Sequence, residues 1–393
     1  MEERSTRGTP SSHGLRVTGG TDEYLQQVLR RCPALLRPYR PHALSFSGYA
    51  SSGVAAVRGA VAPAWLLHST ETPVVLSDGG TVSLDWWPFH GDSARPVVAL
   101  LLPGLGSSSR SIYIRMAMDR FSKAGLRPVA LNYRGVEHLE PTSQRLAAAD
   151  AWRDLPEVLR AVKDAHPGSV VVAVGYSMGG VILARYLGES GIDCGISAAV
   201  TVSAPLDYQE HHRKLLGQKK LSFVLSLPLK AWFLSKRHEF RRHLPNFRLA
   251  DALRSGSLHG LIEAVLCESN GYASAEEYFR INDPTPLLQR VACPMLVITA
   301  TDDPIVGPDI TPYAAIRGNN RILLAETDKG GHLGWGGLST RWGPTLSASW
   351  ADLVAAQFLS AAASFGGESS EAHLSRLSSD GSCLLQSLPM SRL

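Results

Sequence analysis

The stretch Val170–Leu187, VVVAVGYSMGGVILARYL, decides the fold. Five apolar residues lead into a G-x-S-x-G motif centred on Ser177, and an apolar helical pattern follows. A sharp turn from strand to helix brings neighbouring backbone too close for a Cβ atom, which favours glycine at Gly175 and Gly179. Strained dihedral angles would lift the Ser177 Oγ above the sheet. We therefore predict that Ser177 is a nucleophile. The alternative is a glycine-rich turn with an incidental serine.

Short apolar runs recur on both sides of this stretch, with amphipathic helical segments between them. They are Val97–Leu102, Val129–Leu131, Ala198–Val202, Met295–Ala300 and Ile322–Leu324. Runs of this kind are typical of strands that are buried on both faces of a mostly parallel sheet. Upstream, Val74–Leu76 and Thr81–Trp86 flank the turn residues Ser77–Gly80, which predicts an antiparallel hairpin. The expected fold class is α/β, with an open sheet flanked by helices.

The alternation stops after Val202, and a basic, helical stretch follows. We divide the chain into an N-terminal extension (1–72), an α/β core (73–205 and 291–363), an inserted helical cap (206–290) and a serine-rich tail (364–393). Within the cap, the capping-box spacing at Ser274–Glu277 predicts the start of a helix. Met1–Gly20 and the tail are expected to be disordered.

A serine nucleophile needs a base, and the base needs a carboxylate that fixes its tautomer. The strand ending at Ala300 runs directly into Asp302 and Asp303, at the strand end where open α/β sheets place their sites. We choose Asp303, which stands immediately before Pro304-Ile305. Asp302 is the alternative, since one of two adjacent aspartates can simply cap the turn. His332 lies in a glycine-rich loop after the last strand. The order Ser, Asp, His is that of α/β hydrolases.

The glycine-rich loop Pro103–Ser107 follows the strand that ends at Leu102. The backbone N–H groups of Leu105 and Met178 are the expected donors to an oxyanion. A nucleotide loop of the G-x-G-x-x-G type is disfavoured, because Ser109 stands where the third glycine belongs.

Composition excludes several classes of protein. The chain has 393 residues, a net charge of only +4, and no isolated run of Lys and Arg, which disfavours nucleic-acid binding. Its five cysteines form no C-x-x-C pair, so no disulfide framework or zinc knuckle is expected. The stretch His238–His243 misses H-E-x-x-H by one residue. We therefore expect no metal and no cofactor.

With these motifs in place, the chain resembles the AB hydrolase 4 family, the α/β-hydrolase domain-containing lipases and esterases, over about Pro73 to Phe358. The matching motifs are Asp78–Thr81 with Leu84–Trp86, Leu102–Gly106 with Tyr113–Arg115, Asn132–Gly135, Gly175–Gly180, Ser274–Tyr278, Asp302–Ile305 and Gly331–Gly334. The resemblance implies a triad of Ser177, Asp303 and His332, and action on acylglycerols or phospholipids. Val136–His138 and Ser47–Ala56 depart from the family pattern. Because segments of this kind can line or support a pocket, the departures bear on how far the family's substrate range, more than its mechanism, carries over to this chain.

Between His211 and His243 the cap carries nine basic residues and one acidic residue, Glu239, with aromatic and aliphatic residues between the basic clusters. Such a segment can lie in a lipid headgroup layer, which would suit a lid over Ser177. The alternative is a solvated basic face over a buried helix. We hypothesise peripheral contact with anionic membranes that weakens with salt.

Met1–Gly20 lacks the apolar region of a secretory signal, and no stretch reaches the ~20 apolar residues of a membrane span. The C-terminal Ser391-Arg392-Leu393 is a close variant of the peroxisomal S-K-L signal. The expected location is the cytoplasm or a peroxisome-like organelle.

These observations predict a serine hydrolase that cleaves carboxylic esters of lipids or small molecules through an acyl-Ser177 intermediate. Two alternatives stay open: an acyltransferase on the same triad, and a non-catalytic binding protein on a hydrolase scaffold.

Overall fold

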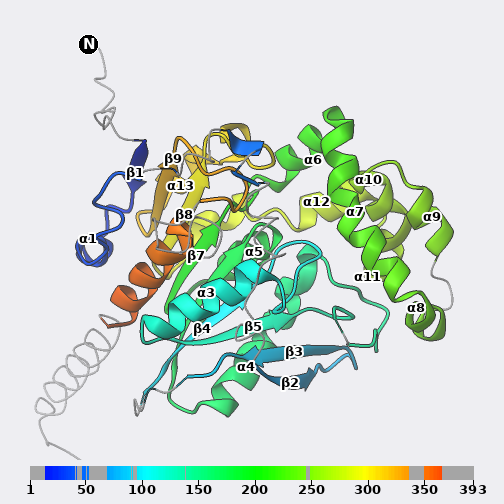
Figure 1. Cartoon of the computed structure of the whole chain (residues 1–393), viewed down its shortest axis with the longest axis horizontal. Helices are drawn as coiled ribbons and strands as arrows, with labels where there is room; N and C mark the ends of the chain where they lie inside the picture. Colours follow the sequence, from blue (N-terminus) through cyan, green and yellow to red (C-terminus); the bar gives the residue numbers. More distant parts are fainter. Residues whose placement is uncertain are drawn as a thin grey trace, which may run out of the picture.

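The computed structural model describes residues 14–39, 41, 47–49, 51–52, 69–89, 91, 95–137, 139–244, 248–335 and 349–364. Its centre is a nine-stranded sheet with the strand order β1-β9-β8-β7-β6-β4-β5-β3-β2 (Figure 1). The strands are β1 (Leu15–Gly19), β2 (Thr70–Val75), β3 (Thr81–Trp86), β4 (Val97–Leu102), β5 (Arg127–Asn132), β6 (Val170–Tyr176), β7 (Ala198–Val202), β8 (Met295–Ala300) and β9 (Ile322–Thr327).

The pairing of the strands confirms the predicted fold class. The six strands β4 to β9 run parallel to their neighbours among these six. The predicted hairpin is present, because β2 pairs antiparallel with β3, and β3 extends the sheet antiparallel to β5. Since the carboxyl ends of parallel strands meet at one edge, the loops that follow β4, β6, β8 and β9 converge there.

The prediction of a disordered lead-in over Met1–Gly20 is wrong for its last residues. Leu15–Gly19 form the edge strand β1, which pairs antiparallel with β9 from Leu15 opposite Thr327 to Gly19 opposite Leu323. The segment is short, and only its first residue is fully buried. The strand is held by backbone hydrogen bonds to β9 and has no apolar pattern of its own. The composition of the segment therefore did not predict a strand.

Helices cover both faces of the sheet (Figure 1). On one face pack α1 (Glu23–Arg30), α3 (Ile112–Lys123) and the helix over residues 350–364; on the other pack α4 (Leu155–Ala165) and α5 (Met178–Ser190). Alternate residues of each strand serve the two layers. In β4, for example, Leu100 joins the cluster around α5, whereas Leu101 joins the cluster around α3.

The chain between β7 and β8 is helical and projects from one end of the sheet (Figure 1). Its helices are α6 (Tyr208–Gly217), α7 (Lys219–Ser235), α8 (Arg237–His243), α9 (Leu249–Arg254), α10 (Leu258–Leu261), the π-helical turn Ile262–Leu266, α11 (Cys267–Asn270), α12 (Ala275–Ile281) and the 3₁₀ helix η6 (Thr285–Arg290). We call this region, residues 206–290, the cap. The helix start predicted at Ser274 is confirmed, since the Ser274 side chain caps α12 by accepting a hydrogen bond from the N–H of Glu277.

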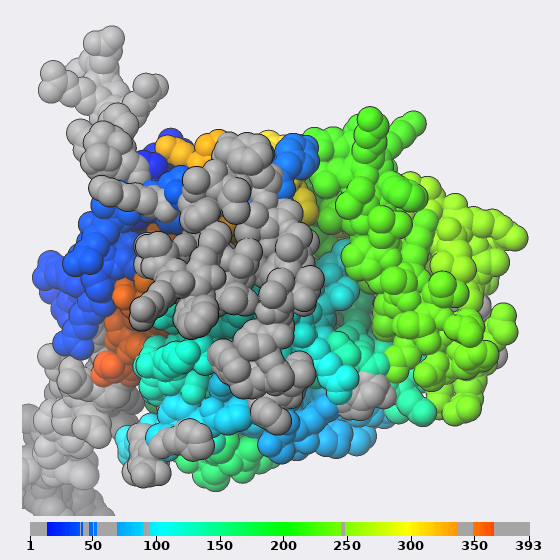
Figure 2. Space-filling view, viewed as in Figure 1, coloured from blue at the N-terminus to red at the C-terminus, as the bar shows by residue number. Residues whose placement is uncertain are grey.

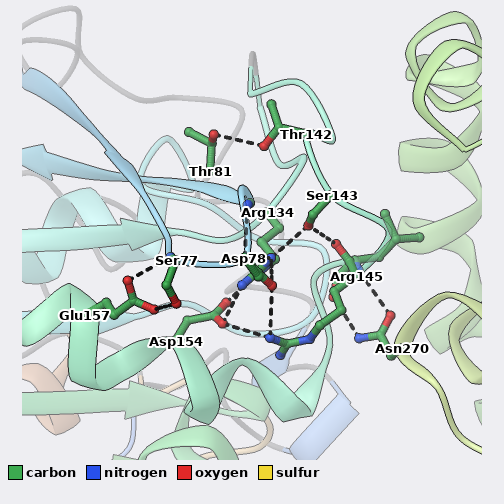
Figure 3. Close-up of polar contacts among 12 residues, drawn as sticks. Ser77, Asp78, Thr81, Arg134, Thr142, Ser143, Arg145, Asp154, Glu157 and Asn270 are labelled. Carbon is green, nitrogen blue, oxygen red and sulfur yellow. Dashed lines mark hydrogen bonds and ion pairs between the residues drawn. The ribbon is translucent and has the colours of Figure 1, made fainter.

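A buried ionic network ties the loop after β5 to the rest of the core (Figure 3). The Arg134 guanidinium donates two hydrogen bonds of 2.8 Å to the Asp154 carboxylate and also contacts Asp78 in the β2–β3 turn. Arg134 and Asp154 are both almost fully buried, so removing either partner would leave the other as an unpaired buried charge. The network holds the segment Gly135–Glu137, which borders the cavity described below.

The returning part of the cap is also anchored to the core. The amide of Asn270, at the end of α11, donates to the Leu146 carbonyl and the Asp150 carboxylate, and accepts from the Leu146 N–H (Figure 3). The Tyr278 hydroxyl accepts from the N–H of Ala149. These bonds fix the position of the cap relative to the edge of the sheet that carries the loops.

Among the described residues, no helix combines the length and the apolar character that crossing a bilayer requires. The predicted serine-rich tail, apart from the end of the helix over 350–364, lies outside the described residues. So does Ser391-Arg392-Leu393.

Candidate active site

Ser177 lies at the turn between β6 and α5 with a φ of 51°, a left-handed conformation that is strained for a residue with a side chain. The two glycines of the motif are required by close approach of backbone. A Cβ atom at Gly175 would lie 2.3 Å from the Gly179 carbonyl oxygen, and one at Gly179 would lie 2.1 Å from the Leu102 carbonyl oxygen. This crowding is the reason that the sequence analysis gave for glycine at both positions.

Three of the predicted site residues lie in one hydrogen-bonded row. The Nε2 atom of His332 is 3.0 Å from the Ser177 Oγ, and the Nδ1 atom is 2.9 Å from the Asp303 Oδ2. The Asp303 side chain is fully buried, and that of His332 is 13% exposed. The Asp303 Oδ1 accepts hydrogen bonds from the N–H groups of Ile305 (2.8 Å) and Val306 (2.9 Å), so the orientation of the carboxylate is set by its own turn.

Asp302, the alternative carboxylate, points elsewhere. Its Oδ1 accepts a 2.8 Å hydrogen bond from the N–H of Gly331, the residue before His332. Asp303 is thus hydrogen-bonded to the imidazole ring of His332, whereas Asp302 is hydrogen-bonded to the backbone of the loop that carries this ring.

Further contacts to this loop come from serines that the sequence analysis did not select. The Oγ of Ser52 accepts from the His332 N–H at 2.8 Å, and the Oγ of Ser203 accepts from the Leu333 N–H at 3.4 Å. A Cβ atom at Gly331 would lie 2.3 Å from the Gly48 carbonyl oxygen and 2.9 Å from the Ser51 Cβ, so these residues pack closely on the loop. The described residues of Ser47–Ala56 therefore support the loop that carries His332. Ser203 has a left-handed φ of 47°, a backbone conformation that the sequence alone does not indicate.

The predicted oxyanion loop lies beside the nucleophile. A Cβ atom at Gly104 would be 3.2 Å from the Ser177 Cβ, and both Leu105 and Met178 line the adjoining cavity. The N–H of Gly104 donates to the hydroxyl of Tyr113 at 2.9 Å, which orients the loop one residue before Leu105. Burial raises the pKa of Tyr113, so its hydroxyl stays protonated. In the sequence, Tyr113 stands out only as part of a family motif.

A cavity of about 470 Å³ lies between the core and the cap, and Met178, the residue after Ser177, is part of its lining. Core residues Leu105, Tyr133 and Met178 form one wall, and residues of α7, among them Leu229 and Trp232, form the other. Its lining also includes Val136 and Glu137, from the other segment that departs from the family pattern. This is a concave, mostly apolar site of the size that takes small organic ligands.

A second histidine lies near the row without joining it. His211, on α6, is buried, and its Nδ1 has no hydrogen-bond partner among the described residues. Burial, reinforced by the proximity of His332, lowers the pKa of His211 to about 3. The ring is therefore neutral near pH 7 and adds no charge beside the row.

An alcohol, an imidazole and a buried carboxylate in sequence, next to an apolar cavity, are the elements of nucleophilic acyl transfer. The fold and this arrangement define the class of protein as an α/β hydrolase.

Comparison with known proteins agrees with this class. The model of the alpha/beta hydrolase family matches residues 99–341, and the chain belongs to that family. Phospholipase ABHD3 of Homo sapiens is 27% identical over 361 residues, covering 90% of this chain and 85% of the relative. Monoacylglycerol lipase ABHD2 of Danio rerio is 26% identical over 327 residues, covering 78% and 76%. Medium-chain fatty acid ethyl ester synthase/esterase 2 of Saccharomyces cerevisiae is 30% identical over 262 residues, covering 61% and 58%. These matches confirm the resemblance that the motifs indicated.

Proposed function

We propose that the chain is a serine hydrolase that cleaves carboxylic esters of lipids. The observation that carries the proposal is the row Ser177–His332–Asp303 beside the apolar cavity. That the chain is a hydrolase of the carboxylesterase type is supported by the family match and by the names phospholipase, lipase and esterase among its relatives.

In the proposed mechanism, the Ser177 Oγ attacks the ester carbonyl while the His332 Nε2 takes its proton. Asp303 holds the Nδ1–H tautomer and stabilises the imidazolium that forms. The N–H groups of Leu105 and Met178 stabilise the negative charge on the carbonyl oxygen, each contributing roughly 3 kcal/mol. His332 then protonates the oxygen of the departing alcohol. The acyl group remains bound to Ser177. Water, deprotonated by His332, attacks the acyl group; the His332 imidazolium then returns this proton to the Ser177 Oγ as the carboxylic acid leaves.

The relatives that act on lipid esters support a lipid substrate, and the apolar cavity is consistent with an acyl chain lying between Met178 and α7. A second function, transfer of the acyl group to an alcohol, is favoured by one observation. The yeast relative is named an ester synthase as well as an esterase. An alcohol that occupies the cavity in place of water would form a new ester from the same acyl-Ser177.

The test is hydrolysis of p-nitrophenyl esters of increasing chain length, a monoacylglycerol and a phosphatidylcholine by the wild-type chain and by Ser177→Ala. We expect wild-type turnover on at least one lipid ester and a loss of at least about 10³-fold in kcat in the variant. Added ethanol and analysis for ethyl esters would separate acyl transfer from hydrolysis. Equal turnover by the two proteins would contradict the proposal.

A further inference from the structure

The solvent-exposed side of α7 carries large apolar residues, which is unusual for a helix face that contacts only water. Four large apolar side chains are exposed on it: Phe223 (44%), Val224 (56%), Leu227 (44%) and Leu234 (48%). With exposed Ala231 they form a stripe about 100° wide at helical spacing. The face that is buried in the cap instead includes two serines, Ser222 and Ser226, beside Leu229 and Phe233. We call the stripe the apolar face of α7.

Basic residues lie at both ends of this face. Lys219 and Lys220 begin α7, and Arg237, Arg241 and Arg242 follow on α8; all five are exposed. The ion pairs that the described residues form nearby, Arg213 with Glu210 and His243 with Glu140, involve none of these five. The result is an apolar strip with exposed basic residues at both ends; the cap that carries it is drawn in green on the right of Figure 2.

The same helix is a wall of the active-site cavity. Pro228, Leu229, Ala231, Trp232 and Ser235 of α7 line the cavity on the side opposite Met178. The contact with the oxyanion loop is close, because a Cβ atom at Gly106 would lie 2.7 Å from the Pro228 Cβ. Ala231 is both exposed and part of the cavity lining. The apolar face therefore adjoins the opening to the cavity.

We propose that the apolar face of α7 docks on the surface of a lipid bilayer that contains anionic lipids. Aliphatic and aromatic side chains enter the boundary between headgroups and acyl chains, while the flanking Lys and Arg residues contact the anionic headgroups. A second copy of the chain fits less well. A two-fold contact through this face would set Lys219 and Lys220 against the basic residues of α8 in the other copy. In its link to catalysis the inference rests on the proposed function: a lipid ester would pass from the bilayer along α7 into the cavity.

The test is flotation of full-length Ser177→Ala protein with vesicles, so that no hydrolysis alters the lipids. We expect binding to vesicles of phosphatidylcholine with phosphatidylglycerol at low salt, and little binding to phosphatidylcholine alone or in about 0.5 M NaCl. Adding Phe223→Ser and Leu227→Ser should weaken binding by at least about tenfold. The matched control is Ile192→Ser, which removes a side chain that is 87% exposed in the 3₁₀ turn Gly191–Asp193, outside α7 and α8.

Two results would overturn the inference. One is the absence of vesicle binding at low salt, or binding that is unchanged by the α7 substitutions. The other is a dimer in sedimentation velocity that these substitutions dissociate, with no vesicle binding, which would assign the face to a second copy. Vesicle binding is measured without turnover, so a failure of docking and a failure of the proposed hydrolase activity are distinguishable.

Discussion

Replacement of Asp303 by Asn tests how the carboxylate controls His332. The Asp303 Oδ1 accepts from two backbone N–H groups, of Ile305 and Val306, so the oxygen of an asparagine must stay on that side. Its NH₂ group then faces the His332 Nδ1, at the position of the present 2.9 Å contact. The Nδ1 atom would have to accept, and the proton would move to Nε2. An Nε2–H group cannot take the proton of Ser177, whose Oγ lies 3.0 Å away.

The expected loss in kcat is about 10⁴-fold, the size known for this change of tautomer in a serine triad, which corresponds to about 5 kcal/mol of transition-state stabilisation. The assay is kcat and KM on a soluble ester near pH 7. Asp302→Asn is the matched control. It keeps an oxygen that can accept from the Gly331 N–H and should retain activity within about tenfold. The reasoning is refuted if Asp303→Asn stays within tenfold of wild type, or if the Asp302 variant loses as much.

Three further predictions follow from other parts of the structure. The pKa of His211 is about 3 in the folded chain, against 6.5 for an unperturbed histidine. Protonation therefore favours the unfolded state, and the free energy of unfolding falls as the pH drops below about 6.5. In His211→Leu the free energy of unfolding, measured with urea, should fall by about 2 kcal/mol less between pH 7 and pH 5 than in wild type; equal losses would count against a buried neutral ring. Tyr113→Phe removes the acceptor for the Gly104 N–H and should lower kcat about tenfold with little change in KM, whereas a change confined to KM would rule out a role in orienting the oxyanion loop. We propose that Ser391-Arg392-Leu393 directs the chain to a peroxisome-like organelle; fluorescence microscopy of an N-terminally tagged protein should show a shift to the cytoplasm when these residues are deleted, and an unchanged distribution would dismiss the signal.

The central sheet could be predicted from the sequence because its strands carry their own signal. The runs at Val97–Leu102, Ala198–Val202 and Met295–Ala300 have the bounds of the observed strands, since strands that are buried on both faces are apolar throughout. The edge strand β1 was not predicted because an edge strand of this kind forms through its backbone pairing with a neighbouring strand. Nothing in the composition of Leu15–Gly19 indicates that β9 lies beside it.

The order of Ser177, Asp303 and His332 was visible in the sequence because each follows a strand at the same edge of the sheet. The choice between Asp302 and Asp303 required coordinates, since the two differ only in the direction in which adjacent side chains leave one turn. The contacts of Ser52 and Ser203 with the His332 loop could not be predicted for a different reason. Ser52 contacts a residue 280 positions away, and no local pattern encodes such a contact.

The most direct test of the central claim is labelling of the intact protein with a fluorophosphonate, followed by intact-mass measurement and peptide mapping beside Ser177→Ala. An activated nucleophile predicts one adduct per chain, on Ser177, and none in the variant. Absence of an adduct in folded protein, or an adduct on another residue that persists in Ser177→Ala, would contradict the assignment of Ser177 as the nucleophile.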